Sequence, residues 1–226
     1  MDSQKPVAKH NDTQPLVSVG IPTFNRPQGL HRALQCIREQ TYKNTQIIVS
    51  DNCTPGEEIN NQMRAAVLDD VRIQYFRQTR NIGATANFEF VLEKSNGKYF
   101  FWMADDDLCD KYFVEKIVSA LEQDSNLVLC GCDVTVIDES DQFLESIKLD
   151  SIRPNGNWLL TRKLFFCYPT SNIFFCIYGI ARTEILKKCG GLYKFAWKGL
   201  ATNSEVTFLA RLSRAGKIAV LMTISA

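Results

Sequence analysis

The sequence predicts an α/β fold: a Rossmann-like, mostly parallel central sheet flanked by helices. First, short apolar runs alternate with segments of helical periodicity over residues 15–137, as in parallel sheets with crossover helices. Second, residues 98–104 are aromatic or apolar at nearly every position, as in a strand buried on both faces. Third, polar and acidic residues follow these runs directly, and ligands bind at that edge of an open parallel sheet.

The chain opens with a polar tail and one strand–helix unit. Residues 1–14 are polar and are expected to be a disordered N-terminal tail. Residues 16–21 (LVSVGI) predict the first strand, which ends at a proline. Leucine and isoleucine then recur at three- and four-residue spacing, so a helix is expected over residues 28–40.

Two further strand–helix units follow. The second strand is expected over residues 46–50 (QIIVS), and a loop of turn-forming residues leads from it into a helix over residues 57–68. The third strand is expected over residues 71–76. The helix after it, over residues 85–94, stops at an Asn-Gly pair, which is a common helix C-terminus.

The fourth strand is the buried run, and the helix after it is expected over residues 111–121 with Asp110 as its N-cap. Alternating apolar residues predict a strand over residues 127–137. No linker marks a second domain, so residues 15–226 are expected to form one domain. Its remainder is expected to hold a loop at residues 138–157, a helix at residues 158–166 and an apolar segment at residues 173–181. Two helices at residues 183–188 and 202–215 and a last strand at residues 217–223 should follow.

Composition and charge exclude several classes of protein. The 226 residues include 26 basic and 25 acidic side chains, a formal charge of +1, which gives no broad electrostatic footprint for nucleic acid. No apolar run reaches the roughly 18 residues of a transmembrane helix, and no apolar signal segment is visible, so a cytoplasmic protein is expected. The 8 cysteines form no C-x-x-C pair, which disfavours a zinc site, and the cytosol should keep them reduced.

Three consecutive carboxylates, Asp105, Asp106 and Asp107, follow the buried strand. They repel each other and are costly near a low-dielectric interior unless a positive charge lies among them. One interpretation is that they only cap a helix or form a solvated turn, but Asp110 already fits the capping position. The favoured interpretation is a divalent cation, because Mg²⁺ is commonly held by one or two carboxylates together with substrate phosphates.

Four loops at the carboxyl edge of the predicted sheet bring hydroxyl, amide, guanidinium and carboxylate groups together. They are residues 22–26 (PTFNR), 51–54 (DNCT), 80–83 (RNIG) and the acidic triplet. This set suits a nucleoside diphosphate. Taken alone, Asn25 and Asp51 are more simply interpreted as turn residues. Neither a G-x-G-x-x-G nor a G-x-x-x-x-G-K-[ST] motif is present, which disfavours dinucleotide binding and P-loop hydrolysis.

Together these features resemble one protein family. Residues 17–26 (VSVGIPTFNR) look like the opening strand and loop of inverting family-2 glycosyltransferases with the GT-A fold. Asp51 falls where that family places an acid on the nucleobase, Asn81-x-Gly83 is also similar, and Ala104 to Asp107 stand at its D-x-D metal motif. The resemblance extends over residues 16 to about 220, nearly the whole chain.

The resemblance implies a role for each matching residue. The nucleotide would be bound by Pro22, Thr23, Asn25, Arg26, Asp51, Arg80, Asn81 and Asp105. Asp106 and Asp107 would bind Mn²⁺ or Mg²⁺. The metal ion would act as a Lewis acid on the leaving diphosphate. Residues 15–137 would then be the nucleotide-sugar-binding half and residues 138–226 the acceptor-side half. Replacement of Asp51 by alanine is expected to weaken nucleotide binding and to leave the fold intact.

Glu205 is expected to be the catalytic base. On the expected helix, Glu205, Leu209 and Leu212 share one face, and relatives carry their base in this region. From the residues alone the simpler interpretation is a capping box, Thr202-x-x-Glu205. Inverting transfer needs a base on the acceptor hydroxyl and a stabilised leaving group on the other side of the sugar.

The sequence departs from the family at three places. The acid that is common at the position of Ala104 is absent, and Ser204-Glu205 replaces a Glu-Asp pair. The chain also stops just after the last expected strand, so the acceptor-side half is expected to be truncated relative to many relatives.

The favoured function is metal-dependent, inverting transfer of a sugar from a nucleotide diphosphate sugar to a hydroxyl group. The acceptor would be a glycan or a lipid-linked saccharide, in surface polysaccharide or glycan synthesis, and peripheral membrane association stays open. Two alternatives remain: a non-catalytic nucleotide-sugar-binding module and a sugar-phosphate nucleotidyltransferase. The second class usually has a Gly-rich basic loop where this chain has residues 23–26.

Overall fold

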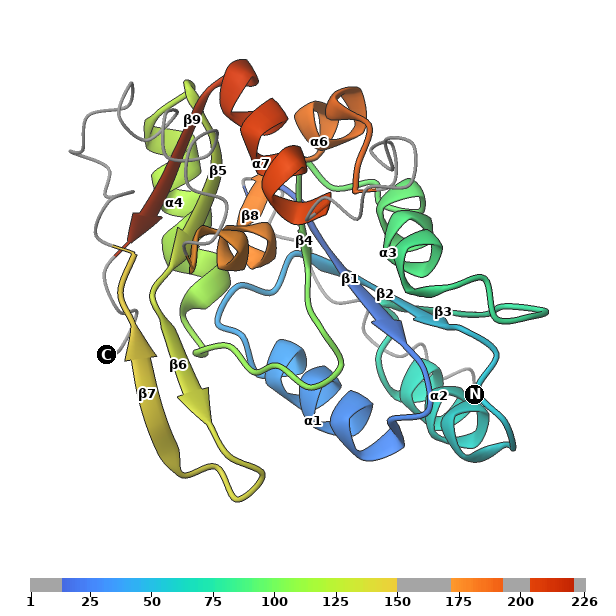
Figure 1. Cartoon of the computed structure of the whole chain (residues 1–226). Coiled ribbons are helices and arrows are strands. Elements are labelled where there is room, and N and C mark those ends of the chain that lie inside the picture. Colours follow the sequence, from blue (N-terminus) through green and yellow to red (C-terminus); the bar gives the residue numbers. More distant parts are fainter. Residues whose placement is uncertain (1–13, 150–171, 193–203, 222–226) are drawn as a thin grey trace, which may run out of the picture.

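The computed structural model describes residues 14–149, 172–192 and 204–221 (Figure 1). Within them a central sheet of seven strands has the order β3-β2-β1-β4-β8-β5-β9, beside a two-stranded hairpin of β6 and β7. The strands are β1 (Val17–Thr23), β2 (Thr45–Asp51), β3 (Ile73–Arg77), β4 (Tyr99–Trp102), β5 (Leu127–Cys132), β6 (Val134–Ile137), β7 (Phe143–Ile147), β8 (Ile180–Arg182) and β9 (Lys217–Leu221). Neighbouring strands of the sheet are parallel except at β8, which confirms the predicted mostly parallel sheet.

Helices cover both faces of this sheet (Figure 1). They are α1 (Pro27–Arg38), α2 (Glu58–Asp69), α3 (Ala84–Glu93), α4 (Phe113–Gln123), α6 (Thr183–Cys189), α7 (Ser204–Ala215) and the 3₁₀ helix η2 (Asn172–Tyr178). Apolar residues of α1, α2 and α4 pack in one core with Phe101, and those of α3, α6 and α7 pack in the other with Phe100 and Trp102. Successive residues of β4 therefore point into opposite cores, as expected for a strand buried on both faces.

The predicted strand at residues 127–137 is wrong as a single element. It divides at Asp133 into β5, which stays in the central sheet, and β6, which leaves it to pair with β7. β7 lies inside the segment expected to be a loop, where the Asp138 carboxylate accepts hydrogen bonds from the backbone N–H groups of Ser140 and Gln142, at 2.8 and 2.9 Å. The alternating pattern fits a strand on both sides of Asp133, so periodicity alone does not reveal the change of sheet.

The segment expected only to be apolar at residues 173–181 contributes most of η2 and the start of β8. β8 inserts between β4 and β5 and runs antiparallel to both. A short strand that joins two neighbours distant in the sequence carries no local signal of its partners, so only the tertiary structure reveals this insertion.

Helix starts also differ from the sequence prediction. α4 begins at Phe113, and Asp110 makes a turn before it instead of capping it: Asp110 Oδ1 accepts a 2.8 Å hydrogen bond from the Tyr112 N–H. The described part of α7 begins at Ser204, inside its predicted range of residues 202–215. The predictions for residues 1–13, for the helix at residues 158–166 and for Thr202 fall outside the described residues. Among the helices that are described, none has both the length and the apolar character needed to cross a membrane.

Candidate active site

The last residues of three adjacent strands lie side by side at the carboxyl edge of the sheet. The register pairs Thr23 of β1 with Asp51 of β2, and Asp51 with Arg77 of β3. On the other side of β1, β4 ends at Trp102 and leads into the acidic triplet. The loops after these four parallel strands therefore meet at one edge, as the sequence predicts.

Asp105 connects the loop after β4 to the loop after β1. Thr23 Oγ1 donates a 2.7 Å hydrogen bond to Asp105 Oδ2, and Arg26 Nη1 lies 3.3 Å from Asp105 Oδ1. Burial raises the pKa of Asp105 above its ordinary value, and the contacts with Thr23 and Arg26 oppose that rise. The carboxylate of Asp105 is thus a buried group, fixed in place by residues of the neighbouring strand and loop.

Asp106 and Asp107 are exposed beyond this buried carboxylate. Arg26 also forms an ion pair with Asp106, so one guanidinium compensates two of the three acids. Within the described residues no cation pairs with Asp107. Desolvation by the surrounding loop, together with the negative charges of Asp106 and Asp105, raises the pKa of Asp107 to about 6.

These acids fit a hard divalent cation. The exposed carboxylates of Asp106 and Asp107 present only oxygen ligands, which Mg²⁺ and Mn²⁺ prefer. The raised pKa of Asp107 indicates negative charge that a cation would compensate. Where the structure is described, no three histidine, cysteine, aspartate or glutamate side chains are grouped to hold a metal by themselves. Other oxygen ligands, such as substrate phosphates, would have to complete the coordination.

Asp51 is buried, whereas the sequence interpretation took it as a strand-end side chain that faces solvent or ligand and packs little. Its side chain is only 1% exposed. Its Oδ1 accepts a 2.9 Å hydrogen bond from the Thr54 N–H, and its Oδ2 lies 3.4 Å from the Tyr75 hydroxyl and 3.6 Å from Arg77 Nε. Burial and the negative charge of Asp51 raise the pKa of Tyr75 to about 12. The expectation that alanine at position 51 leaves the fold intact is therefore wrong in its premise.

Arg77 is a site residue that sequence reasoning missed. Besides its contact with Asp51, its Nη2 donates to the carbonyl oxygens of Thr54 and Gly56, both at 2.9 Å, and its Nη1 lies 2.9 Å from Glu57. It therefore fixes the whole loop between β2 and α2. The available signal was its position: β3 extends one residue beyond its predicted end and places Arg77 at a strand end, like Asp51.

Asn81 joins the site through Asn52, a second residue that was not singled out. Asn52 Nδ2 donates to Asn81 Oδ1 at 3.0 Å, and Asn52 Oδ1 accepts from the Ile82 N–H at 2.8 Å. Asn81 Oδ1 also accepts from the Gly83 N–H at 2.9 Å, just before α3. The loops after β2 and β3 are consequently held together by side-chain amides.

The remaining predicted residues divide between structural and exposed positions. Asn25 has a positive φ of 58°, and its N–H donates to Thr54 Oγ1 at 2.8 Å, so it shapes the turn between β1 and α1. Pro22 is buried within β1, next to the strand end. Arg80 is exposed, and within the described part of the chain it makes no hydrogen bond or ion pair.

Glu205 lies in the first turn of α7, but its side chain falls outside the described residues. Leu209 and Leu212, which were predicted to share its face, are both fully buried. Phe208, three residues after Glu205, packs edge-on against Trp102 with ring centroids 5.9 Å apart. Phe208 therefore packs α7 against the strand that leads into the acidic triplet.

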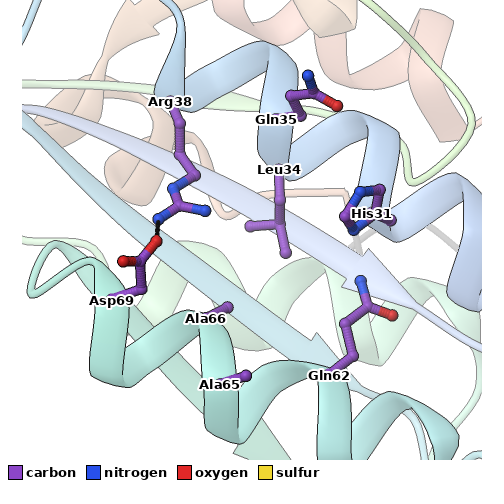
Figure 2. A pocket seen from close by; sticks show the side chains of 8 residues that line it. All are labelled: His31, Leu34, Gln35, Arg38, Gln62, Ala65, Ala66 and Asp69. Atoms are coloured by element: carbon purple, nitrogen blue, oxygen red, sulfur yellow. Dashed lines mark hydrogen bonds and ion pairs between the residues drawn. The ribbon is translucent and has the colours of Figure 1, made fainter.

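A groove of about 610 Å³ opens between α1 and α2, away from these residues (Figure 2). It is lined by His31, Leu34, Gln35, Arg38, Gln62, Ala65, Ala66 and Asp69, and an ion pair between Arg38 and Asp69 spans it. It shares no residue with the predicted site.

The chain matches a family model with the description "Glycosyl transferase family 2" over residues 18–189. A curated relative from Campylobacter jejuni, named GalNAc(5)-diNAcBac-PP-undecaprenol beta-1,3-glucosyltransferase, is 34% identical over 94 residues, or 41% of this chain and 30% of the relative. The chain spans less than half the length of matched glycosyltransferases from Rickettsia, Haemophilus influenzae, Escherichia coli and C. jejuni, from 20% to 43%.

Two solved glycosyltransferase structures share the fold. S. aureus TarS 1-349 in complex with UDP-GlcNAc has a TM-score of 0.66 at 15% identity, over 93% of this chain and 59% of TarS 1-349. The mannosyltransferase PcManGT from Pyrobaculum calidifontis, in complex with GDP-Man and Mn²⁺, has a TM-score of 0.64 at 16% identity, over 97% of this chain and 60% of its own. Both are of the GT-A type, so the predicted GT-A fold is confirmed.

Proposed function

Because the chain belongs to glycosyl transferase family 2, we propose that it moves a sugar from a nucleotide diphosphate sugar to a hydroxyl group, with inversion and with Mn²⁺ or Mg²⁺. The observation that carries the proposal is the contact of Asp105 with Thr23 and Arg26. It joins the loops of two adjacent parallel strands and leaves Asp106 and Asp107 exposed beside them. Residues 15–137 are the donor half in this proposal and residues 138–226 the acceptor half.

The nucleoside would lie over the loops after β1, β2 and β3. Asn25, Arg80 and Asn81 offer amide and guanidinium groups there, beside Pro22. Asp51 would act mainly by holding the loop between β2 and α2, since its carboxylate is buried and already bonded to Thr54. TarS 1-349 was solved with UDP-GlcNAc and PcManGT with GDP-Man, and both ligands are of the donor class proposed here.

The diphosphate would lie over the acidic triplet. A divalent cation held by Asp106 and Asp107 would supply a Lewis acid for the leaving diphosphate. Arg26 is more than half exposed, and its ion pair with the equally exposed Asp106 is a weak surface contact, worth at most about 1 kcal/mol. The guanidinium can therefore turn toward a phosphate without a large loss of stability.

Glu205 is proposed as the base that takes the proton of the acceptor hydroxyl. Glu205 lies about one helical turn before Phe208 in α7, and Phe208 packs against Trp102. Trp102 is the last residue of the strand that leads into the acidic triplet, over which the diphosphate is proposed to lie. One carboxylate on the acceptor side and a stabilised diphosphate on the other meet the needs of inverting transfer.

The acceptor would be a glycan or a lipid-linked saccharide, in surface polysaccharide or glycan synthesis in the cytoplasm or at its membrane. The name of the C. jejuni relative includes a diphosphoundecaprenol-linked saccharide, which supports the lipid-linked alternative. A binding module without catalysis remains the second candidate, because the acid common at the position of Ala104 is missing.

A thermal-shift screen of nucleoside diphosphates and nucleotide sugars with Mn²⁺ tests this proposal. A true donor present at 100 times its dissociation constant should stabilise the protein by about 2.7 kcal/mol. Nucleoside monophosphates serve as the control, since they lack the second phosphate over the triplet. The proposal fails if no diphosphate or sugar derivative raises the melting temperature above the monophosphate control.

A further inference from the structure

Two cysteines from distant parts of the chain meet beside the acidic triplet. Cys36 lies in α1, and Cys109 lies two residues after Asp107. Their sulfur atoms are 3.5 Å apart, and the Cys109 N–H donates a hydrogen bond to Cys36 Sγ at 3.1 Å. We propose that Cys36 and Cys109 form a reversible thiol–disulfide site, oxidised by small-molecule disulfides such as oxidised glutathione.

The geometry of the pair favours a bond between these two sulfurs. A disulfide requires a sulfur separation of about 2.0 Å, so the two atoms need to approach by about 1.5 Å. Gln40 Nε2 holds the loop in place, since it donates to Cys109 Sγ at 3.4 Å and to the Asp110 carbonyl oxygen at 2.8 Å. The backbone around Cys109 is therefore already fixed against α1.

The two cysteines also differ from the buried cysteines in exposure, and Cys36 differs in its acidity. Both residues are partly exposed, whereas Cys130 and Cys176 are buried. The hydrogen bonds from Cys109 lower the pKa of Cys36 below its ordinary value, against the opposing effect of burial. Cys36 should therefore supply the attacking thiolate, because the thiolate is the reactive form of cysteine.

The proposed oxidation balances in two exchange steps. The Cys36 thiolate attacks one sulfur of oxidised glutathione, a bond from Cys36 to that sulfur forms, and the other glutathione leaves as a thiolate. Cys109 then loses its proton and attacks the Cys36 sulfur, which releases the second glutathione. The two protein thiols are oxidised to one disulfide, one glutathione disulfide is reduced to two thiols, and the two protons pass to the released glutathiones.

The cross-link would restrain the loop that carries the triplet. It would join α1 to that loop across 73 residues of sequence. α1 already contacts the same loop closely, because a Cβ at Gly29 would lie only 2.4 Å from the Asp105 carbonyl oxygen. In a reducing cytosol such a bond is expected to be transient and to respond to redox conditions. This inference rests on the thiol geometry and not on the proposed sugar transfer.

Peptide mapping of the whole protein after incubation with oxidised glutathione tests the proposal. In the wild type we expect a linked peptide pair that contains Cys36 and Cys109, a mass loss of two hydrogens, and reversal by dithiothreitol. In Cys109→Ser the second exchange is blocked, so glutathione should stay attached to Cys36. Cys189→Ser is the matched control, since Cys189 is also partly exposed and should leave the linked pair unchanged.

Two results would overturn the proposal. One is a wild-type protein that ends with glutathione on Cys36 and a free Cys109, or with either residue linked to another cysteine. The other is a Cys109→Ser variant in which glutathione attaches to Cys36 no faster than to Cys189. If Cys109→Ser does not fold, the wild-type peptide map decides the question by itself.

Discussion

At the scale of single residues, Asp51 contributes both to the fold and to the proposed nucleoside site. Replacement by alanine removes the buried acceptor for the Thr54 N–H and one of two ionic partners of Arg77, which keeps Glu57. We expect Asp51→Ala to lower the free energy of unfolding by about 1–3 kcal/mol, because a buried donor is left unsatisfied. Urea denaturation followed by circular dichroism measures this loss.

Asp69→Ala is the control for Asp51→Ala. Asp69 is exposed and pairs with Arg38, which keeps Asp70 as a second partner. Surface ion pairs of this kind contribute at most about 1 kcal/mol, so the control should change stability little. Equal unfolding free energies for Asp51→Ala and Asp69→Ala would show that the buried contacts of Asp51 carry no stability.

Cys36 should react at lower pH than an unperturbed thiol. Its hydrogen bonds with Cys109 lower its pKa, whereas burial raises the pKa of Cys189. Because only the thiolate reacts, each alkylation rate rises with pH through the pKa of its own thiol. We expect the rate at Cys36, followed by mass spectrometry with iodoacetamide, to reach its midpoint at lower pH than at Cys189. The reverse order of midpoints would contradict the assigned environment of Cys36.

Some residues of the site could be predicted because polar and charged side chains come directly after the ends of the strands. Thr23, Arg26 and Asp105 were singled out by type and position, and the structure brings them into contact. Arg77 and Asn52 were not, because an arginine at an exposed-looking strand end and an asparagine in a turn-rich loop have simpler interpretations. Only their hydrogen bonds across loops distinguish them from ordinary turn residues.

At the scale of elements, the prediction about catalysis concerns Glu205 in α7. If Glu205 is the general base, Glu205→Gln should reduce turnover by about 10²- to 10⁴-fold and leave nucleotide binding almost unchanged. Glutamine can still serve a helix-capping role, so a purely structural Glu205 would lose little activity. Transfer assays with the donor from the thermal-shift screen and a matching acceptor measure the difference.

Glu184→Gln is the control for the helix α7 variant. Glu184 lies in the neighbouring helix α6, where it forms an exposed ion pair with Lys188. Its loss should leave turnover close to that of the parent. Transfer by Glu205→Gln within threefold of the parent rate would reject Glu205 as the base and favour another acid or a binding module.

Elements with strong local periodicity were predicted well, and elements defined by their partners were not. The strand and helix order up to α4 follows from alternation and turn residues alone. The hairpin of β6 and β7 and the insertion of β8 were missed, since a strand's sequence does not specify which strand it pairs with. The start of α4 was misplaced because Asp110 suits a turn as well as a cap.

At the scale of the whole molecule, the sheet order explains why one edge holds the proposed chemistry. β1 lies between β2 and β4, so the loop after β1 borders both the nucleoside side and the acidic side. The parallel arrangement of β3, β2, β1 and β4 directs all their carboxyl ends to that edge. The antiparallel β8 lies between β4 and β5, and β9 pairs with β5 at the far edge of the sheet.

The central claim is that the acidic triplet holds a divalent cation which the nucleoside diphosphate needs. Isothermal titration calorimetry of the best diphosphate from the screen tests it most directly, in Mn²⁺ and in chelator, with wild type and Asp107→Asn. We expect at least about tenfold tighter binding with Mn²⁺ for the wild type, equivalent to about 1.4 kcal/mol. This advantage should disappear in Asp107→Asn, with unchanged affinity in chelator. Equal wild-type affinity with and without Mn²⁺ would contradict the claim.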